Sequence, residues 1–305
     1  MAGAAVLGVD LGATNMRVAV VTPEGGIVSR AAQATPADDP GALPRLMIEV
    51  ASTASEELRG AVVGVPAVVD YEHGVAGRMP NLSAWEGHLA AQPLADACGL
   101  PAVLANDADL AAVGEHRYGA GRGTDDMVYL TISTGIGGGV VIGGQLLHGK
   151  RSLAEVGQTT IDYRALRTLE SLAAGPALER VSGLSGAEAT RRAQAGDAAA
   201  LGGLREIAEA IAVGVANAIE AYMPERVVIG GGVAAAGALL LDPLRERLAG
   251  MHTARLLDPS RVVPASGGDD DGLRGAWPLW EYASTREAGE TLAPRAPAGR
   301  GAAPD

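Results

Sequence analysis

Several residue types are absent or scarce in this chain of 305 residues. It contains no Phe, and aromatic residues make up only 3%, so a core must be built from Val, Leu, Ile and Ala. A single cysteine, Cys98, excludes an intrachain disulfide framework and any multi-cysteine metal site. No apolar stretch approaches the roughly 18 uninterrupted residues of a membrane span, and the chain does not begin with a basic region followed by an apolar one.

Basic residues are in the minority. The 24 Lys and Arg residues stand against 36 Asp and Glu residues, and the net charge of -12 argues against a polyanionic partner such as DNA. The length exceeds one ordinary core and fits two lobes of about 150 residues each. We therefore expect a soluble, cytoplasmic, two-lobed protein with no nucleic-acid and no membrane partner.

Short apolar runs alternate with helical stretches along the chain. The run over residues 6–10 is followed by a glycine turn and a second run over residues 18–21, which predicts a β-hairpin. The clearest helix covers residues 204–222, where apolar residues recur at spacings of three and four and Pro224 follows. Strands that alternate with helices predict an α/β fold with largely parallel sheets. The other predicted strands cover residues 61–65, 101–105, 127–132, 139–142, 226–229 and 261–263.

The pair Asn106-Asp107 directly follows the apolar run of residues 100–105. Parallel-sheet proteins place reacting groups at the C-terminal ends of their strands, so this pair is a candidate reaction site. An Asn-Asp pair at a strand end is also typical of a turn or a helix N-cap. The pair alone leaves both interpretations open.

Three glycine-bearing turns lie next to predicted strands and are candidates for holding a nucleotide. In residues 10–15, a glycine lets backbone N–H groups approach a phosphate, and Asp10 can position a magnesium ion through water. Residues 133–139 are mostly hydroxyl-bearing residues and glycines, a composition that suits a curled backbone that binds phosphate. The segment is not a Walker A loop, because no Gly-Lys-Ser/Thr follows, and it is not a dinucleotide fingerprint, because a strand rather than a helix follows it. Residues 230–232 can let an adenine or ribose lie against the backbone, and all three segments could equally be plain tight turns.

These segments, in this order, resemble the ROK family of repressors and sugar kinases, and within it the bacterial glucokinases. The resemblance covers about residues 5–280, and the set is specific although each piece is short. The matching segments are Asp10 to Arg17, Gly64 to Asp70, Pro80-Asn81-Leu82 with Trp85, Asn106-Asp107 through Gly114-Glu115, Thr134 to Gly139, Glu155 to Gln158, Leu169-Glu170-Ser171 with Gly175 to Leu178, Gly230 to Val233, and Asp269-Asp270 with Gly272-Leu273.

The resemblance implies a two-lobed α/β fold of the actin-like ATPase (ribonuclease H-like) type, with ATP, Mg²⁺ and a sugar meeting in the cleft between the lobes. It implies a small N-terminal lobe over residues 1–117, completed by a C-terminal helix near residues 272–286, and a large lobe over residues 118–271. We expect residues 287–305 to form a disordered tail and the protein to be a homodimer.

The resemblance also implies roles for single residues. Asp107 would be the general base that accepts the proton of a sugar hydroxyl. Substrate contacts would come from Asn81, Asn106, Glu155, Gln158 and Glu170. Contacts to ATP would come from Asp10, Gly12, Thr14, Asn15, Arg17, Thr134, Gly135, Gly137, Gly230, Gly231 and Gly232, with Asp10 also holding Mg²⁺ through water.

One position departs from the family pattern. Gln158 stands where most family kinases carry a histidine that binds a structural zinc together with three loop cysteines. The loop over residues 159–169 is short and free of cysteine, so we expect no structural zinc. Because the family histidine also contacts the sugar, Gln158 places an amide there and leaves a hexose or a sugar-like cyclitol open as the substrate.

The resemblance thus predicts an ATP-dependent kinase acting on a primary hydroxyl of a hexose or of a C7-cyclitol. A repressor would need a DNA-binding domain ahead of Asp10, where only nine residues stand. Two competing hypotheses stay open. The protein could be a sugar-binding or regulatory protein without kinase activity, or a glucokinase that uses polyphosphate as its phosphate donor.

Overall fold

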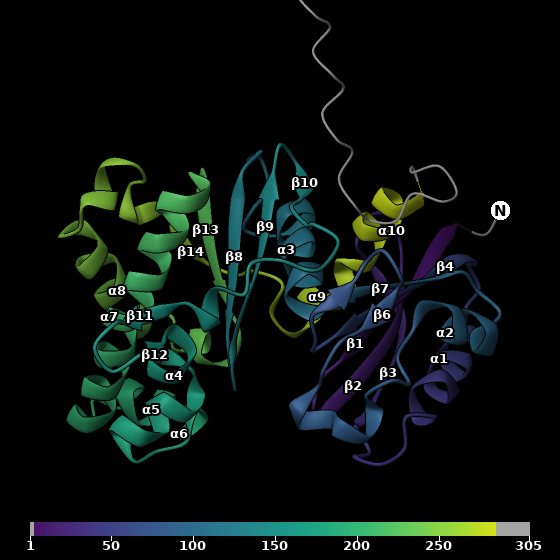
Figure 1. The fold of residues 1–305 in the computed structure, drawn as a ribbon, viewed down its shortest axis with the longest axis horizontal. Helices are drawn as coiled ribbons and strands as arrows, with labels where there is room; N and C mark the ends of the chain where they lie inside the picture. The colour runs from purple at the N-terminus through teal and green to yellow at the C-terminus, as the bar shows by residue number, and fades with distance from the viewer. Residues whose placement is uncertain (1–2, 285–305) are drawn as a thin grey trace, which may run out of the picture.

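The computed structural model describes residues 3–284, so the predicted tail over residues 287–305 lies outside the described residues. Two five-stranded sheets form its centre, and helices cover both (Figure 1). Strand order is β3-β2-β1-β4-β7 in the first sheet. Its strands are β1 (Ala4–Leu11), β2 (Asn15–Val21), β3 (Ile27–Ala34), β4 (Glu57–Val65) and β7 (Ala102–Asn106).

The central strands of the first sheet are buried on both faces, and their apolar residues are accordingly nearly continuous. Leu7 belongs to the core beneath α1 (Ala42–Ser52) and α2 (Ala91–Cys98). Its neighbour Val6 belongs to a second core, shared with α9 (Asp271–Arg274) and α10 (Ala276–Ser284). The last helices therefore return to the first sheet, and we propose that the small lobe includes them.

The second sheet has the order β10-β9-β8-β13-β14. Its strands are β8 (Met127–Ile132), β9 (Ile136–Ile142), β10 (Gln145–Leu146), β13 (Arg226–Gly230) and β14 (Val262–Pro264). Five helices share one apolar core with this sheet, and α5 and α6 reach it by packing on α7. These helices are α4 (Leu169–Ala173), α5 (Gly175–Ser182), α6 (Gly186–Gln194), α7 (Ala198–Tyr222) and α8 (Ala238–Ala249). The predicted helix over residues 204–222 is the C-terminal part of α7, and its apolar stripe lies in the large-lobe core.

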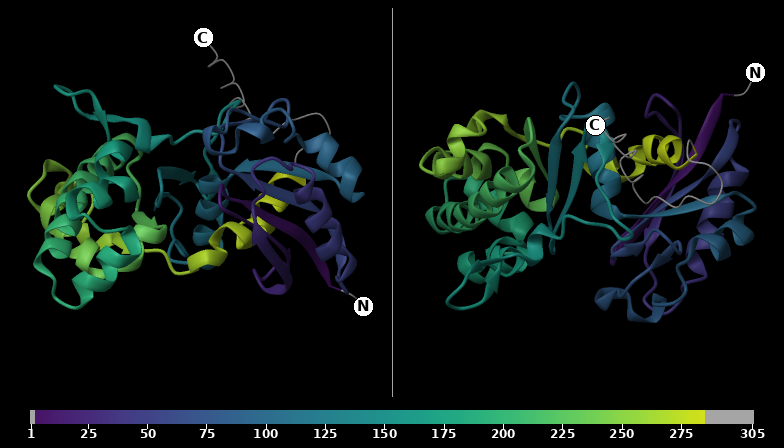
Figure 2. Two further views of the ribbon diagram at one scale, coloured as in Figure 1. Left: turned by 90° about the horizontal axis from the view of Figure 1, so that it is seen from below. Right: turned by 45° about the horizontal axis from the view of Figure 1, so that its top comes forward.

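Helix α3 (Asp107–Tyr118) lies between the two sheets (Figure 1). It begins where β7 ends and packs against β8 and β9 of the second sheet and against α9 and α10. The chain passes between the lobes directly after α3 and returns just before α9, and Figure 2 shows these connections from two further sides. Within residues 3–284, no helix is long and apolar enough to cross a membrane.

The predicted strands and the α/β class are confirmed, but the two main sheets are mixed rather than largely parallel, since each has two parallel and two antiparallel strand pairs. The short strand β10 and the two small two-stranded sheets were not predicted. Strand β3 was not predicted, because this edge strand carries Ser29, Arg30 and Gln33 and is exposed at most of its positions. Strand β9 begins at Ile136 rather than at Gly139, so a run predicted to be a loop is largely strand.

Candidate active site

The C-terminal ends of three parallel strands bring Asp10 and Asp107 together. Asp10 in β1 is paired with Gly64 in β4, and Asn106 ends β7 beside Val65. Parallel strands end at a common edge, which is why side chains distant in the sequence meet here. Gly64 carries no side chain, and a Cβ atom there would lie 3.7 Å from the Cα atom of Asp107. The nearest atom to such a Cβ would be Cδ2 of Leu110 at 2.9 Å, so the glycine makes room for the α3 helix at this edge of the sheet.

Asn106 caps helix α3. Its Oδ1 atom accepts hydrogen bonds from the backbone N–H groups of Ala108 at 3.0 Å and Asp109 at 3.2 Å. Its Nδ2 atom donates to the carbonyl oxygen of Ala67 at 3.1 Å, and the residue is 9% exposed. The N-cap interpretation is therefore correct for Asn106, and a sugar contact from this amide stays a prediction.

Asp107 is partly buried, and two other carboxylates act on its ionisation. Burial raises the pKa of its carboxyl group to about 7, and the negative charges of Asp10 and Glu155 act in the same direction. Its Oδ1 atom accepts a hydrogen bond from the backbone N–H of Ala108 at 2.8 Å, which lowers the pKa. A carboxyl group with a pKa near neutrality is well matched to general base catalysis.

The turn between β1 and β2 presents polar groups beside Asp10. The Asp10 carboxylate forms an ion pair with Arg17 at 2.7 Å, and both side chains are partly exposed. Thr14 and Asn15 are exposed at the tip of the turn. The N–H of Gly12 donates to the carbonyl oxygen of Asn15 at 2.9 Å. The turn is thus an internally bonded hairpin turn with exposed polar residues at its tip.

Asp10 is the candidate ligand for magnesium. The described part of the chain holds no group of three or more His, Cys, Asp or Glu side chains that could bind a metal ion. A single carboxylate still fits Mg²⁺, which usually keeps several waters and binds through one or two carboxylates together with substrate phosphates. The donor set at this edge is therefore compatible with a nucleotide-bound magnesium ion.

A second turn follows β8 at residues 133–135. It is closed by a hydrogen bond from the N–H of Ser133 to the carbonyl oxygen of Gly135 at 2.8 Å, and Thr134 is exposed. Gly135 leaves space for Glu170, because a Cβ atom at Gly135 would lie 2.6 Å from the Glu170 Oε2 atom. That oxygen accepts a hydrogen bond from the N–H of Ile136 at 2.8 Å. Glu170, a predicted sugar contact, thus also stabilises the turn that is predicted to contact phosphate.

The prediction of a long curled glycine loop is wrong for Gly137 to Gly139. These residues lie within β9, where helix α3 crosses close to the strand. A Cβ atom at Gly137 would lie 3.1 Å from the Cβ atom of Ala108, and one at Gly139 would lie 2.5 Å from that of Ala112. The glycines therefore let α3 approach β9. Only residues 133–135 of the segment predicted to bind phosphate form a turn.

The third glycine turn lies beside the second, because β13 runs parallel to β8. Gly230 packs on the ring of Tyr129 and is buried. Gly231 has a φ of 86°, and a Cβ atom there would lie 2.4 Å from the carbonyl oxygen of Ile132. Both this conformation and the close approach require glycine. Gly231 and Gly232 are exposed at the strand end and leave a surface without side chains beside the turn at residues 133–135.

Glu155, Gln158 and Glu170 form a group on the large lobe. Gln158 donates a hydrogen bond from Nε2 to the Oε1 atom of Glu170 at 3.1 Å. Burial, and then the charge of Glu170, raise the pKa of Glu155. The charge of Glu155 also raises the pKa of Asp107, so Glu155 is the member of this group that acts on the Asp107 carboxyl group. The carboxylates can accept hydrogen bonds from several hydroxyl groups of a polyol.

Asn81 is the predicted contact that the structure does not connect to this site. It is exposed at the start of a 3-10 segment, Pro80–Trp85. No hydrogen bond within residues 3–284 links it to Asp107 or to the large-lobe glutamates, so its role stays a prediction.

A short hairpin forms the cysteine-free loop over residues 159–169. It consists of β11 (Thr160–Asp162) and β12 (Arg167–Thr168). The Asp162 carboxylate accepts hydrogen bonds from the backbone N–H groups of residues 164 and 165 and forms an ion pair with Arg167 at 2.8 Å. These bonds lower the pKa of Asp162, the backbone bond to residue 165 most. The Asp162 carboxylate thus bonds to three groups of this loop.

Replacing Asp162 with Ala is expected to loosen this loop without unfolding the protein. The two backbone donors and the Arg167 guanidinium lose their common acceptor, which is partly exposed to solvent. Amide hydrogen exchange over residues 160–168 should accelerate at least about tenfold, with the exchange of α7 unchanged. Unchanged exchange in the hairpin would contradict the assignment, and Asp258→Ala, at another exposed backbone-bonded aspartate, is the matched control.

Three buried polar residues near the site were not predicted as functional. Asp109 and Glu115 on α3 are fully buried, and Asp271 on α9 is 5% exposed. Burial first, and then neighbouring Glu115, raise the pKa of Asp271 to about 8. The sequence pattern that could have indicated buried polar groups is the placement of Asp109 and Glu115 among the apolar residues of one helix. This pattern is common in exposed helices as well.

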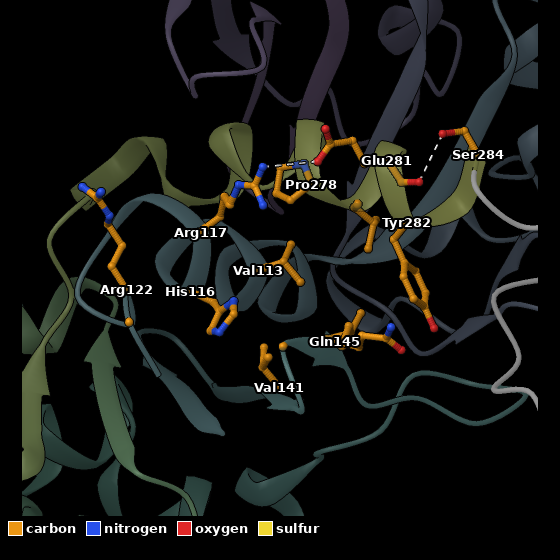
Figure 3. Close-up of a pocket in the computed structure, with 14 residues that line it drawn as sticks. Val113, His116, Arg117, Arg122, Val141, Gln145, Pro278, Glu281, Tyr282 and Ser284 are labelled. Carbon is orange, nitrogen blue, oxygen red and sulfur yellow. Dashed lines mark hydrogen bonds and ion pairs between the residues drawn. The ribbon is translucent and has the colours of Figure 1, made fainter. Parts of the chain in front are cut away.

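A cavity of about 620 Å³ lies at the other end of α3 (Figure 3). Its walls come from α3, the β9–β10 hairpin and α10, with His116, Gln145 and Tyr282 among the lining residues. His116 is nine residues from Asp107, which corresponds to roughly 14 Å along a helix. The cavity is therefore separate from the candidate active site.

Comparison with known proteins identifies the family of the chain. The chain matches the model of the ROK family over residues 6–283. It is 32% identical to a glucokinase from Thermotoga maritima over 304 aligned residues, which cover 89% of this chain and 95% of the relative.

Two solved structures are similar in both fold and sequence. A ROK family glucokinase from Streptomyces griseus, in complex with glucose and AMPPNP, is 29% identical with a TM-score of 0.79, covering 90% of this chain and 98% of that chain. A ROK hexokinase from Thermus thermophilus is 31% identical with a TM-score of 0.76, covering 91% and 99%. The chain belongs to the ROK family and has its two-lobed actin-like ATPase fold.

Proposed function

We propose that this protein is an ATP-dependent kinase that phosphorylates a primary hydroxyl of a hexose. The observation that carries the proposal is the position of Asp107 at the strand ends next to Asp10, a partly buried carboxyl group whose pKa is raised to about 7 by burial and by the charges of Asp10 and Glu155. Membership in the family supports it, as does the Streptomyces griseus glucokinase that binds glucose and AMPPNP.

The proposed reaction places the sugar between the two lobes. Asp107 accepts the proton of the attacking hydroxyl as the new bond to phosphorus forms, which typically contributes about 10²- to 10⁴-fold. Glu155, Gln158 and Glu170 accept hydrogen bonds from the other hydroxyls and orient the ring. The nucleophile is thereby held in line with the phosphate, and positioning of this kind is a major source of the rate.

ATP is expected against the two turns of the large lobe. The turn at residues 133–135 would contact its phosphates, and Gly230 to Gly232 would lie under the adenosine. Arg17, Thr14 and Asn15 on the small-lobe turn would approach the phosphates from the opposite side. Magnesium, when bound with ATP near Asp10, neutralises charge on the transferred phosphoryl group.

The test is ADP release measured with ATP and Mg²⁺ against a panel of hexoses, N-acetylhexosamines and C7-cyclitols. We expect turnover with a hexose and no turnover when Mg²⁺ is omitted. If a cyclitol is the best substrate, the proposed substrate class changes from hexose to cyclitol. If turnover with polyphosphate equals or exceeds turnover with ATP, the proposed phosphate donor changes to polyphosphate. Polyol binding without phosphate transfer in any combination would refute the kinase proposal.

Replacing Gln158 with Ala is expected to raise the KM for the sugar about 5- to 20-fold with kcat changed less than about threefold. The amide holds Oε1 of Glu170, so its loss frees one sugar-facing carboxylate without touching Asp107. Initial rates at varied sugar and saturating ATP measure the effect. Gln92→Ala, which also removes an exposed amide paired with a carboxylate, is the control and should leave both constants unchanged. An unchanged sugar KM for Gln158→Ala would exclude Gln158 from the sugar site.

A further inference from the structure

Asp109 is a fully buried carboxyl group two residues beyond Asp107 on helix α3. Its Oδ2 atom accepts a hydrogen bond from the hydroxyl of Tyr71 at 2.8 Å. Its Oδ1 atom is buried and has no hydrogen-bond partner among residues 3–284. The candidate active site uses neither Asp109 nor Tyr71, so the structure presents a buried polar pair without an assigned role.

The surroundings of Asp109 disfavour a negative charge. The ionisable groups that act on it are Tyr71, Asp107 and Glu155, and none of them is a cation. Strand β9, which crosses α3 at Gly139, contains no ionisable side chain. An ionised carboxylate without a cation in such a place is costly, because it has lost its water. Burial is the main reason that the pKa of Asp109 is raised to about 8, while the hydrogen bond from Tyr71 lowers it.

Tyr71 connects Asp109 to the first turn of α3. It directly follows β5 (Val69–Asp70), and its hydroxyl oxygen lies 3.4 Å from the backbone N–H of Asn106, from which it accepts. Burial and the nearby Asp109 raise the pKa of Tyr71 well above its ordinary value, so its hydroxyl stays protonated and donates. Behind it, the ring of His148 packs edge-on at 5.0 Å and restrains the phenol ring.

We propose that Asp109 is a positioning residue that stays protonated in the folded protein and, through Tyr71, holds the end of β7 and the first turn of α3 in the geometry that aims Asp107. The acceptor oxygen of Asp109 fixes the Tyr71 hydroxyl, and that hydroxyl in turn fixes the backbone at Asn106. Asp109 touches neither the sugar nor ATP in this arrangement. The proposal rests on the proposed kinase function for its catalytic part only.

The protonation is tested by the stability of the Asp109→Asn variant as a function of pH. A carboxyl group whose pKa is raised from about 4 in the unfolded chain to about 8 in the folded protein destabilises the fold progressively between those values. The melting temperature of Asp109→Asn minus that of the wild type should therefore increase from about pH 5 to pH 8 and level off above pH 8. A difference that is constant with pH would overturn the protonated state. This measurement needs no activity, so it stands even if the kinase proposal fails.

The positioning role is tested by Tyr71→Phe, which keeps the ring against His148 and removes only the hydroxyl. We expect kcat to fall about tenfold with the KM for ATP within about twofold of wild type, because Asp107 loses its alignment while the nucleotide turns are untouched. Tyr118→Phe, which removes a hydroxyl bonded to the Pro23 carbonyl oxygen at the other end of α3, is the matched control. A kcat for Tyr71→Phe within about twofold of wild type would overturn the positioning role.

The conservative Asp109→Asn variant separates the two parts of the proposal in the kinase assay. Its amide oxygen still accepts from Tyr71, so at pH 7 kcat should stay within about threefold of wild type. Above about pH 8 the wild-type kcat should fall as Asp109 ionises beside Asp107, and the variant should lose that decline. Identical alkaline profiles for the two proteins would contradict an effect of Asp109 on Asp107.

Discussion

Replacing Asp107 with Asn is expected to lower kcat by about 10²- to 10⁴-fold, because an amide cannot accept the hydroxyl proton. The N-cap of α3 is formed by Asn106, so the helix should remain intact in this variant. The loss should appear in kcat, with the KM for sugar within about fivefold of wild type, since the asparagine still forms hydrogen bonds. Initial rates at saturating ATP and sugar measure kcat, and a series at varied sugar gives the KM.

The matched control is Asp197→Asn. Asp197 also stands at a helix N-terminus, where it accepts from the N–H groups of Ala199 and Ala200, and asparagine caps a helix equally well. It lies at the start of α7, and activity should stay within about twofold of wild type. Turnover of Asp107→Asn within about threefold of wild type would show that another group accepts the proton.

The wild-type pH profile gives an independent measure of the same base. A base with a raised pKa of about 7 is protonated and inactive below that value, so kcat/KM should fall as the pH drops through about 7. Asp107→Asn should lose this acidic limb along with most of its activity. An acidic limb retained in the variant would assign the titration to a different group.

The candidate site could be predicted from the sequence where local patterns place a residue at a strand end. Asp10 ends one apolar run and the pair Asn106-Asp107 follows another, and parallel strands bring such ends to one edge. The contacts of Glu170 with the turn at residues 133–135 could not be predicted, because they join segments 34 residues apart. The pair of Asp109 and Tyr71 was missed for the same reason, since the pairing depends on how the β5 segment folds against α3.

The glycine run shows why a composition pattern is ambiguous. Residues 135–139 suit a curled phosphate loop and a close helix–strand contact equally well, since both need the absence of a side chain. The deciding fact is that Ala108 and Ala112 face Gly137 and Gly139, and their approach depends on where α3 lies. Strand β3 escaped prediction because an edge strand with one exposed face carries little apolar signal.

Replacing Glu115 with Ala is expected to cost about 4 kcal/mol of unfolding free energy, a large fraction of the stability of a typical domain. The Glu115 carboxyl group is fully buried and accepts from three backbone N–H groups, those of Ala120 at 2.6 Å, Ser266 at 2.8 Å and Gly267 at 2.7 Å. The three donors belong to residues that are only partly buried or exposed, so each loses less than a fully buried donor, for which the cost of a missing acceptor is about 1–3 kcal/mol. Ala120 follows α3 while Ser266 precedes α9, so one side chain holds both connections between the lobes.

Urea denaturation monitored by circular dichroism measures this loss at pH 7. Glu188→Ala, which removes a carboxylate paired with Arg191 and Arg192 on the surface of α6, is the control and should leave the midpoint close to that of the wild type. A midpoint for Glu115→Ala equal to that of the control would show that water replaces the lost acceptor. In that case Glu115 would not secure the connections.

The pH dependence of stability reports on the same contact. The pKa of Asp271 is raised to about 8, so the folded protein retains a proton that the unfolded chain loses near pH 4, and stability should fall between these values. Part of that shift comes from Glu115, whose carboxyl group lies beside Asp271. Glu115→Ala should therefore lower the overall stability and also flatten its decline between about pH 5 and pH 8. An equally steep decline would mean that burial alone raises the pKa of Asp271, and the two carboxyl groups would then act independently on the connections between the lobes.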